Sequence, residues 1–346
     1  ESAPMPRISS AIAVLGIAAC AAAMPVRHGH GADWPMWRAD ASHSASTAEE
    51  LAAELHLRWT RDLGQPKSCW PYTQHKLQFD LSYEPVAMDG RIFLPSMTRD
   101  RLTAYDAATG AELWRFYADG PVRFAPACHN GKLYFVSDDG FLYCLRAEDG
   151  RLAWKKKGAP QDSRLLGNER MISMWPARGA PVVYDGVVYW AASIWPFTGT
   201  FIYALDAETG AVVWENSGSG QDFILQPHSS PAFAGVAPQG YLTATEDLLL
   251  VSGGRSVPAA YDRRTGEFLY YNIDDKNGGY SVAASPTSFF TDGCIYDLAS
   301  GKLLAKADVS IISGETPIGL AADGVLAGFA RELEEFETVD RKGNAV

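Results

Sequence analysis

The 346-residue chain is 47% hydrophobic and 21% charged, which is typical of a folded protein with a sizeable core and excludes a disordered or fibrous one. Its formal net charge is −11, and its one compact basic run is Lys155-Lys156-Lys157, so nucleic acids and anionic membrane surfaces are poor candidates for partners. The 32 Gly, the 20 Pro and the 12% of aromatic residues favour many short strands over long helices.

Residues 1–32 are expected to lie outside the folded domain. The basic start around Arg7 is followed by an apolar, Ala-rich run over residues 8–26, which is typical of a bacterial export signal. An uncleaved anchor and a disordered N-terminus remain alternatives, and so does lipidation at Cys20, because residues 17–20 resemble a lipobox. The sequence predicts an exported protein, periplasmic or associated with the cell envelope, with no membrane span after signal cleavage.

From residue 33 onward a short motif recurs, D-x-x-[TS]-G followed four residues later by an aromatic residue. Asp accepts nearby backbone N–H bonds and fixes a tight turn, Gly supplies a positive φ, and the aromatic ring buries a large surface on the next strand. These residues therefore read as turn and packing groups and not as a catalytic set. The clear copies lead from Asp106 to Trp114, from Asp206 to Trp214 and from Asp262 to Tyr270; Arg146 to Trp154 lacks the first Asp, and Asp297 to Ala305 lacks the aromatic.

The copy between Gly110 and Gly150 divides into four strands, over residues 111–116, 122–128, 132–137 and 141–145. Repeated groups of four short strands in about 40 residues are the signature of a β-propeller blade. We therefore predict an all-β propeller of four-stranded antiparallel blades over residues 33–346, with about 6–7 blades in this chain. Because a further motif begins at Asp340, we expect the complete protein to be longer, with 7–8 blades. The short spacing from Gly266 to Gly301 predicts one blade without a full hairpin.

Residues 102–145 closely resemble the PQQ-like (pyrroloquinoline-quinone-type) repeat of bacterial β-propellers, and residues 33–46 resemble the opening segment of exported members. The resemblance implies that the motif's aromatic residue packs between adjacent blades. The family includes quinoprotein alcohol dehydrogenases, the lipoprotein subunit of the outer-membrane β-barrel assembly machine, and many exported proteins of mostly unknown role. The resemblance is thus specific for fold and weak for function. The blade-docking residues that it implies are Trp114, Trp154 and Trp214, with Tyr270 as a substitute.

The dehydrogenases of this family pair two neighbouring cysteines beside the quinone, hold Ca²⁺ with Glu, Asn and Asp, and use an Asp base. This chain has no Cys-Cys dipeptide, and no matching carboxylate set can be placed on it. It also lacks the G-x-S-x-G, H-E-x-x-H, P-loop and G-x-G-x-x-G motifs. We therefore predict no catalytic, cofactor-binding or metal-binding residue and disfavour PQQ and calcium as cofactors. Cys128 and Cys144 are either a disulfide or two free buried thiols.

Long insertions interrupt the repeat at residues 158–180, at residues 193–200 and at residues 226–240. On a propeller such loops converge at one mouth of the channel, where aromatic rings beside Arg and His suit a sugar, an anion or a peptide carboxylate. Each candidate also has a structural alternative. The two tryptophans would pack in the core at the bases of the loops, the two arginines would bond loop carbonyls or blade carboxylates, and the histidine would hydrogen-bond polar groups of a buried loop. The candidate ligand-binding residues are Trp175, Arg178, Trp195, His228 and Arg255.

Together these features predict an exported, monomeric propeller that acts as a binding or interaction scaffold without catalysis. Its partner would be a protein, a small molecule or a saccharide at the channel mouth. One alternative is an enzyme, either a degenerate quinoprotein dehydrogenase or a carbohydrate-active propeller. Another is a cell-envelope assembly lipoprotein that resembles the propeller subunit of the barrel assembly machine.

Overall fold

The computed structural model describes residues 32–50, 52–220, 223–225, 229–306, 319–320 and 326–327. Among these residues the regular structure is β-strand, apart from two 3₁₀ turns, η1 (His75–Leu77) and η2 (Pro196–Thr198). The predicted all-β class is therefore confirmed. No helix of the described ranges is long and apolar enough to cross a membrane. The expected export signal and Cys20 lie outside the described residues.

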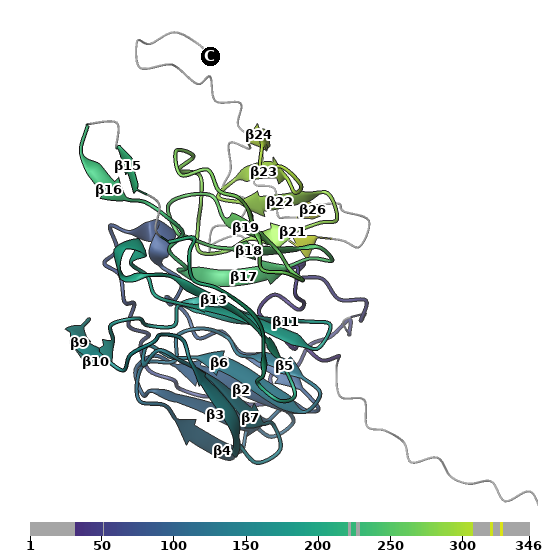
Figure 1. Ribbon diagram of the computed structural model, residues 1–346. Helices are drawn as coiled ribbons and strands as arrows, with labels where there is room; N and C mark the ends of the chain where they lie inside the picture. Colours follow the sequence, from purple (N-terminus) through teal and green to yellow (C-terminus); the bar gives the residue numbers. More distant parts are fainter. Residues whose placement is uncertain are drawn as a thin grey trace, which may run out of the picture. The chain divides into compact units, whose positions relative to one another are not determined.

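Most strands form four-stranded antiparallel sheets in which the strands follow their order in the sequence (Figure 1). The first two sheets are β1 (Val86–Met88), β2 (Arg91–Ser96), β3 (Arg101–Asp106) and β4 (Glu112–Tyr117), then β5 (Ala127–His129), β6 (Lys132–Val136), β7 (Phe141–Arg146) and β8 (Leu152–Lys157). The third and fourth are β11 (Gly179–Tyr184), β12 (Val187–Ala192), β13 (Phe201–Asp206) and β14 (Val212–Asn216), then β17 (Gly240–Ala244), β18 (Leu248–Val251), β19 (Ala259–Asp262) and β20 (Phe268–Tyr270). The fifth is β21 (Ala283–Ala284), β22 (Ser288–Thr291), β23 (Cys294–Asp297) and β24 (Leu303–Lys306).

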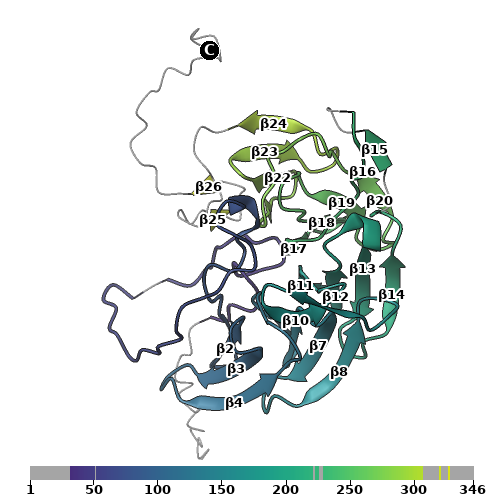
Figure 2. The ribbon, with the colours of Figure 1, turned by 90° about the vertical axis from the view of Figure 1, so that its left-hand side faces the viewer.

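The sheets succeed one another around a common centre, with the first strands inside and the fourth strands outside (Figure 2). The inner strands β11 and β17 pair in parallel, which joins the third and fourth sheets. This is a β-propeller, and the predicted fold class is confirmed. Five blades lie within the described ranges, and most of residues 307–346 lie outside them, so the predicted number of 6–7 blades stays a prediction. The remaining strands form hairpins: β9 (Arg164–Gly167) with β10 (Arg170–Ser173), β15 (Phe223–Leu225) with β16 (Pro231–Phe233), and β25 (Gly319–Leu320) with β26 (Leu326–Ala327).

The repeat in the sequence and the blade in space are offset by one strand. β4, which follows the first D-x-x-T-G motif, closes the first blade instead of opening the second. The strand expected over residues 122–128 shrinks to β5, because Pro121 and Pro126 offer no N–H to a neighbouring strand. The expectation of an incomplete hairpin between Gly266 and Gly301 is also wrong, since short strands let a complete four-stranded blade fit there.

The repeated motif forms the same turn in four of the five described blades; in the second blade Arg146 stands in place of the Asp. The Oδ1 atom of Asp106 accepts bonds from the Thr109 N–H at 2.8 Å and from the Thr109 hydroxyl at 2.7 Å. Gly110 closes the turn with φ +70°, and its N–H donates to the Asp106 carbonyl. The motif's carboxylates are thus occupied by turn bonds. Equivalent bonds recur at Asp206, Asp262 and Asp297.

The motif's aromatic residue reaches from the outer strand of one blade to the turn of the next. Trp114 donates its indole N–H to the Ala147 carbonyl at 3.0 Å, and its ring lies against Gly150. Both contacts support a docking role between blades. The corresponding ring and glycine pairs are Trp59 with Gly110, Trp154 with Gly210, Trp214 with Gly266, and Tyr270 with Gly301. Trp59 makes its contact from residues 52–60, where no strand is formed.

Residues 34–44 run through the centre of the propeller and bond to inner strands of four blades. Trp34 forms a bridge with Ala87, while the carbonyls of Pro35, Ala41 and Ser42 accept N–H bonds from strands of the second, fourth and fifth blades. Trp37 stacks on Tyr241 with ring centroids 4.0 Å apart. The segment therefore fills the centre and ties the blades together, because it satisfies backbone donors that the inner strands leave unpaired.

His43, in this central segment, makes the stability of the protein sensitive to pH. It is buried, and its Nδ1–H donates to the Val282 carbonyl at 2.7 Å. Burial lowers its pKa from 6.5 to about 4, so the unfolded chain takes up a proton first as the pH falls. The contribution of the neutral His43 side chain to the free energy of unfolding is therefore complete above pH 6.5 and is lost as the pH falls towards 4. Between about pH 7 and pH 5 the expected loss is about 2 kcal/mol.

Urea unfolding of the wild type and of His43→Asn at both pH values measures this effect. The Asn variant keeps a donor for the Val282 carbonyl but does not titrate, so its pH dependence should be flatter by about 2 kcal/mol. Equal losses in the two proteins would show that another group is responsible.

Candidate functional site

The two ends of the strands form two faces of different composition. Because the strands of a blade alternate in direction, the first and third turns of each blade share one end, which we call the turn face. The other end, the connection face, carries the middle turn of each blade and the links between blades. The predicted residues Trp175, Arg178, Trp195 and Arg255 belong to connections of this second face. His228 lies outside the described residues.

Arg178 lies in a buried network of four charges at the connection face. Its guanidinium makes two bonds to Asp138, at 2.9 and 3.0 Å. Arg123 bonds the same carboxylate at 2.7 Å and reaches Asp80 at 2.6 Å. All four side chains are at most 4% exposed. Two arginines and two aspartates are thus paired with one another, and the sequence had suggested blade carboxylates as the alternative partners of Arg178.

The network holds Asp138 in its ionised form. Burial alone would raise the pKa of Asp138, but the charges of Arg123 and Arg178 outweigh it and lower the pKa to about 2. The pKa of Arg178 is raised above its ordinary value: burial, the largest single effect, would lower it, but the charge of Asp138, its hydrogen bonds to Arg178 and the nearby Cys69 together outweigh burial. A carboxylate with so low a pKa is a poor general base at neutral pH. The network therefore offers neither a base nor an unpaired arginine.

Residues 67–83, which we call the covering segment, lie over this network. Asp80 in the segment accepts bonds from Ser68 and from the backbone of Cys69 as well as from Arg123. The same segment contacts the connections of other blades. Trp70 packs edge-on against Trp195 at 6.2 Å, Lys67 pairs with Glu169, Lys76 pairs with Asp292, and Leu77 lies against Gly254. The mouth that the sequence predicted as a ligand site is thus occupied by the chain itself.

The two predicted tryptophans lie close together but differ in exposure. Trp175 is buried and donates its indole N–H to the Thr198 carbonyl at 2.8 Å. Trp195, two residues before Phe197, is 42% exposed and stacks on that ring at 6.0 Å. Trp175 therefore supports the loop that presents Trp195 and Phe197.

Arg255 is separated from the other candidates and lies exposed beside the covering segment. It lines a small recess of about 240 Å³ together with Thr73, Gln74, His75, Lys76 and Lys276. The sequence had not singled out the covering segment, Arg123 or Asp138. Asp138 reads as an ordinary turn residue in "SDDG", and the signal that could have identified it is a pair of arginines, Arg123 and Arg178, inside otherwise apolar stretches.

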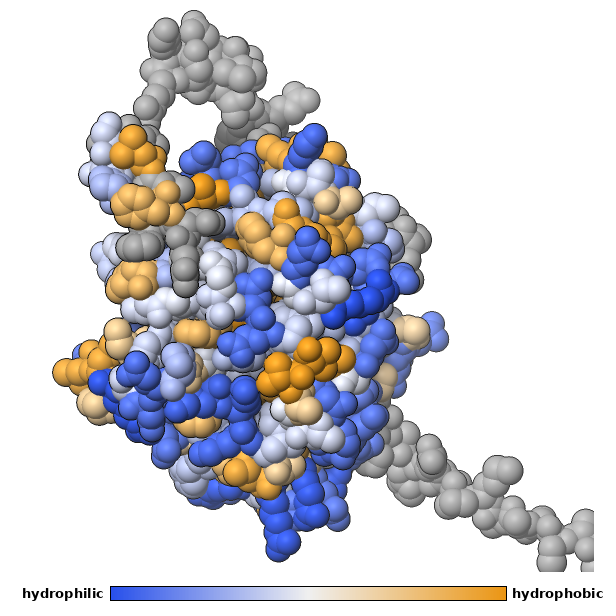
Figure 3. Space-filling model, in the orientation of Figure 1, coloured by the Kyte–Doolittle hydropathy of each residue, from blue (hydrophilic) through white to orange (hydrophobic). Residues whose placement is uncertain are grey.

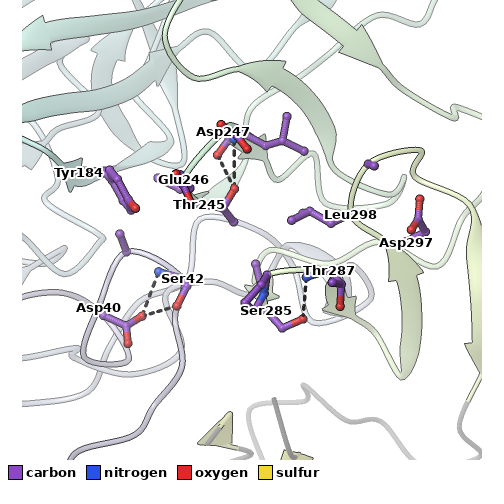
Figure 4. Close-up of a pocket in the computed structure, with 16 residues that line it drawn as sticks. Asp40, Ser42, Tyr184, Thr245, Glu246, Asp247, Ser285, Thr287, Asp297 and Leu298 are labelled. Carbon is purple, nitrogen blue, oxygen red and sulfur yellow. Dashed lines mark hydrogen bonds between the residues drawn. The ribbon is translucent and has the colours of Figure 1, made fainter. Parts of the chain in front are cut away.

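The turn face carries a larger recess of about 830 Å³ (Figure 4). Four carboxylates line it, but Asp40 is bonded to Ser42 and Ser44, and Asp247 pairs with Arg264. Bonds from Ser300 lower the pKa of Asp297, which keeps that group ionised. The recess is acidic, and the hydroxyl of Ser42, which also lines it, donates to the Asp40 carboxylate at 2.8 Å. Its other lining residues include Tyr184, Thr245, Glu246, Ser285, Thr287 and Leu298.

The described residues do not fit a quinone and calcium centre of the expected kind. No group of three or more His, Cys, Asp or Glu that could hold a metal ion is found in the described ranges. Cys128 and Cys144 are free and buried, and so are the other two described cysteines. Burial raises the pKa of Cys144 to about 12 and raises that of Cys128 well above its ordinary value, so both are thiols at neutral pH.

Blades that repeat a D-x-x-[TS]-G turn and a docking aromatic residue resemble those of PQQ-like repeat β-propellers. A family model described as "Outer membrane protein assembly factor BamB" matches residues 56–174. The chain is 29% identical to the dehydrogenase subunit of a quinone alcohol dehydrogenase from Gluconobacter oxydans, over 59% of this chain and 28% of that protein. It is 31% identical to BamB from Yersinia pestis, over 41% of this chain and 35% of that protein. The resemblance to the PQQ-like repeat family is confirmed.

Solved structures support the same fold. The quinohemoprotein alcohol dehydrogenase from Comamonas testosteroni matches with a TM-score of 0.59 and 18% identity, over 86% of this chain and 52% of that one. A europium-containing methanol dehydrogenase matches with a TM-score of 0.54 and 17% identity, over 78% of this chain and 57% of that one. The chain spans less than two thirds of the length of each of these four proteins.

Proposed function

We propose that this protein is an exported, monomeric binding scaffold of the bacterial periplasm or cell envelope that acts without catalysis. One observation carries the proposal. At the connection face the buried charges are paired with one another beneath the covering segment, so the face offers an outer surface for contact and no open reaction site. We retain Trp195 and Arg255 as ligand-contacting residues and assign supporting roles to Trp175 and Arg178.

The outer surface of the connection face is rich in apolar side chains. The hairpins β9–β10 and β15–β16 project from it, and both carry apolar surface (Figure 3). Exposed apolar residues gathered on one face commonly mark protein contacts. The exposed large apolar residues of these projections and of the loop around η2 are Leu165, Leu166, Met171, Trp195, Phe197, Phe223 and Leu225. They support a protein as the partner.

Each of the two alternatives to a non-catalytic scaffold is supported by a specific observation. The acidic recess of the turn face and the relatives named as alcohol dehydrogenases favour an enzyme. Dye reduction that depends on alcohol, PQQ and Ca²⁺ would identify a quinoprotein dehydrogenase. The family model named for BamB favours an envelope assembly lipoprotein, for which mass spectrometry of the mature N-terminus would show lipid on Cys20.

Site-specific photocrosslinking tests the scaffold function. A photoreactive amino acid is placed at Phe197 in the full-length protein, in cells that produce it naturally. We expect a discrete crosslinked product, because the side chain is exposed beside Trp195 on the proposed contact surface. The control position is Leu113, an exposed apolar residue on β4, which should give no such product. Equal products from both positions, or none from Phe197, would contradict the proposed surface.

A further inference from the structure

Three segments from distant parts of the chain meet in the small recess beside Arg255. Residues 73–76 come from the covering segment, Arg255 from the connection between β18 and β19, and Lys276 from the link between the fourth and fifth blades. The cavity measures about 240 Å³. Because blade connections and a crossing segment build it, its walls are set by the fold and not by one flexible loop.

Contacts that do not involve the Arg255 side chain hold the walls in place. Leu77 packs against Gly254, where a Cβ atom would clash with it. The Lys76 ammonium donates to the Lys276 carbonyl at 2.5 Å and forms an ion pair with Asp292. The Arg255 carbonyl accepts a bond from the Gly278 N–H at 3.3 Å. The recess is therefore formed before any ligand arrives.

The recess gathers positive charge in a protein whose net charge is −11. Of its three permanent cations, Lys76 is paired with Asp292. The Lys276 ammonium is bonded to the Ile273 carbonyl and to the Ser256 hydroxyl, both neutral groups. Arg255 is exposed and forms no ion pair with any residue that the structure describes. Like charges at short range repel one another, so an excess of about two positive charges is left for an anion to neutralise.

Neighbouring carboxylates do not cancel this excess. Asp274 and Asp275 precede Lys276 but do not line the recess. Asp275 is bonded to Asn277 and to the Tyr296 hydroxyl, which orients its carboxylate towards those partners. The cations are thus the charged groups that face the cavity.

We propose that this recess binds a phosphate group, either free phosphate or the terminal group of a phosphate monoester. The volume is below that of pockets that enclose a drug-sized ligand, so it suits one terminal group. A guanidinium fork and two ammonium groups match several phosphate oxygens at once. A dianion also matches the excess charge better than a single carboxylate. This site goes beyond the scaffold function and does not depend on it.

Calorimetric titration of the full-length protein tests the proposal. Sodium phosphate, glycerol 2-phosphate and sodium acetate are compared with sodium chloride at equal ionic strength. We expect saturable binding of phosphate and at most weak binding of acetate. In Arg255→Gln/Lys276→Gln the affinity for phosphate should fall by about tenfold or more, because two charge-assisted contacts are lost. The charge-matched control is Arg151→Gln/Lys302→Gln on the turn face, and its affinity should not change.

Each outcome decides the proposal. Absence of saturable phosphate binding by the wild type, or an equal loss in the control, would overturn it. Preferential binding of acetate would overturn the assignment to phosphate. Binding of phosphate without glycerol 2-phosphate would confirm the site and limit it to the free anion. Circular dichroism checks folding, and Arg255→Lys provides a milder variant that keeps the charge but loses the fork, for which an intermediate affinity is expected.

Discussion

Asp138→Ala is expected to destabilise the protein by about 3–5 kcal/mol, because it leaves Arg123 and Arg178 buried without their shared counter-charge. Both guanidiniums would lose charge-assisted bonds of 2.7–3.0 Å in a site that water does not reach easily. Arg123 would keep its ion pair with Asp80, while Arg178 would lose both of its bonds to a carboxylate. Urea unfolding at neutral pH measures the change in the free energy of unfolding.

The matched control is Asp149→Asn, which removes an exposed ion pair with Arg146 on the turn face. We expect a change within about 1 kcal/mol, since water screens exposed pairs. Similar losses in both variants would show that burial of the network contributes little.

The same network predicts how the free energy of unfolding changes at low pH. The pKa of Asp138 is about 2 in the folded protein and 3.8 ordinarily, so the contribution of the group is complete above about pH 4 and is lost as the pH falls from 4 towards 2. It amounts to about 2 kcal/mol. Asp138→Asn should lack this component of the acid transition, although other carboxylates still titrate in both proteins.

Trp214→Ala is also expected to cost about 3–5 kcal/mol, because a buried indole between the third and fourth blades is replaced by a cavity. The ring lies against Gly266 and packs with Tyr189 at 5.9 Å, and its N–H donates to the Arg263 carbonyl at 2.9 Å. The loss should therefore combine apolar burial with a broken hydrogen bond. Thermal and urea unfolding report it.

A pair of glycine variants isolates the contact between the ring and the turn. Gly266 and Gly186 have nearly equal φ values, +75° and +73°, but a Cβ at Gly266 would lie 2.5 Å from the Trp214 ring, while a Cβ at Gly186 would meet nothing within 4 Å. Gly186→Ala should cost about 1–2 kcal/mol from backbone strain alone. Gly266→Ala should cost about 1–3 kcal/mol more from overpacking.

In a Trp214→Ala background the cost of Gly266→Ala should fall to that of Gly186→Ala, because the obstructing ring is gone. Equal costs of the two glycine variants in the wild type would show that the ring yields freely and does not dock the blades.

The prediction of the candidate site was less complete than that of the fold. Arg178, Trp175 and Trp195 were identified because they stand in long insertions, which usually lie at one face of a propeller. Their environments could not be read from those insertions. The partner of Arg178 is 40 residues away, and the segment that covers the mouth ends more than ninety residues before Arg178. Arg255 was identified as a candidate for the same channel mouth, but its cationic neighbours Lys76 and Lys276 were not.

The sequence by itself determined the repeat, the turn and the fold class. The bonds that make the D-x-x-[TS]-G turn join residues two to four positions apart, as between Asp106 and Thr109, so a local pattern is sufficient to predict them. The spacing of the turns then sets the number of strands in each blade.

Only the tertiary structure decided which charges are paired and which remain available. The bond from Lys76 to Asp292 spans 216 residues, and residues 34–44 meet four blades at the centre. Such contacts depend on how the ring brings distant segments together, and no local pattern encodes them. For this reason the predicted mouth proved to be covered by the chain itself, and the cationic recess became visible only in three dimensions.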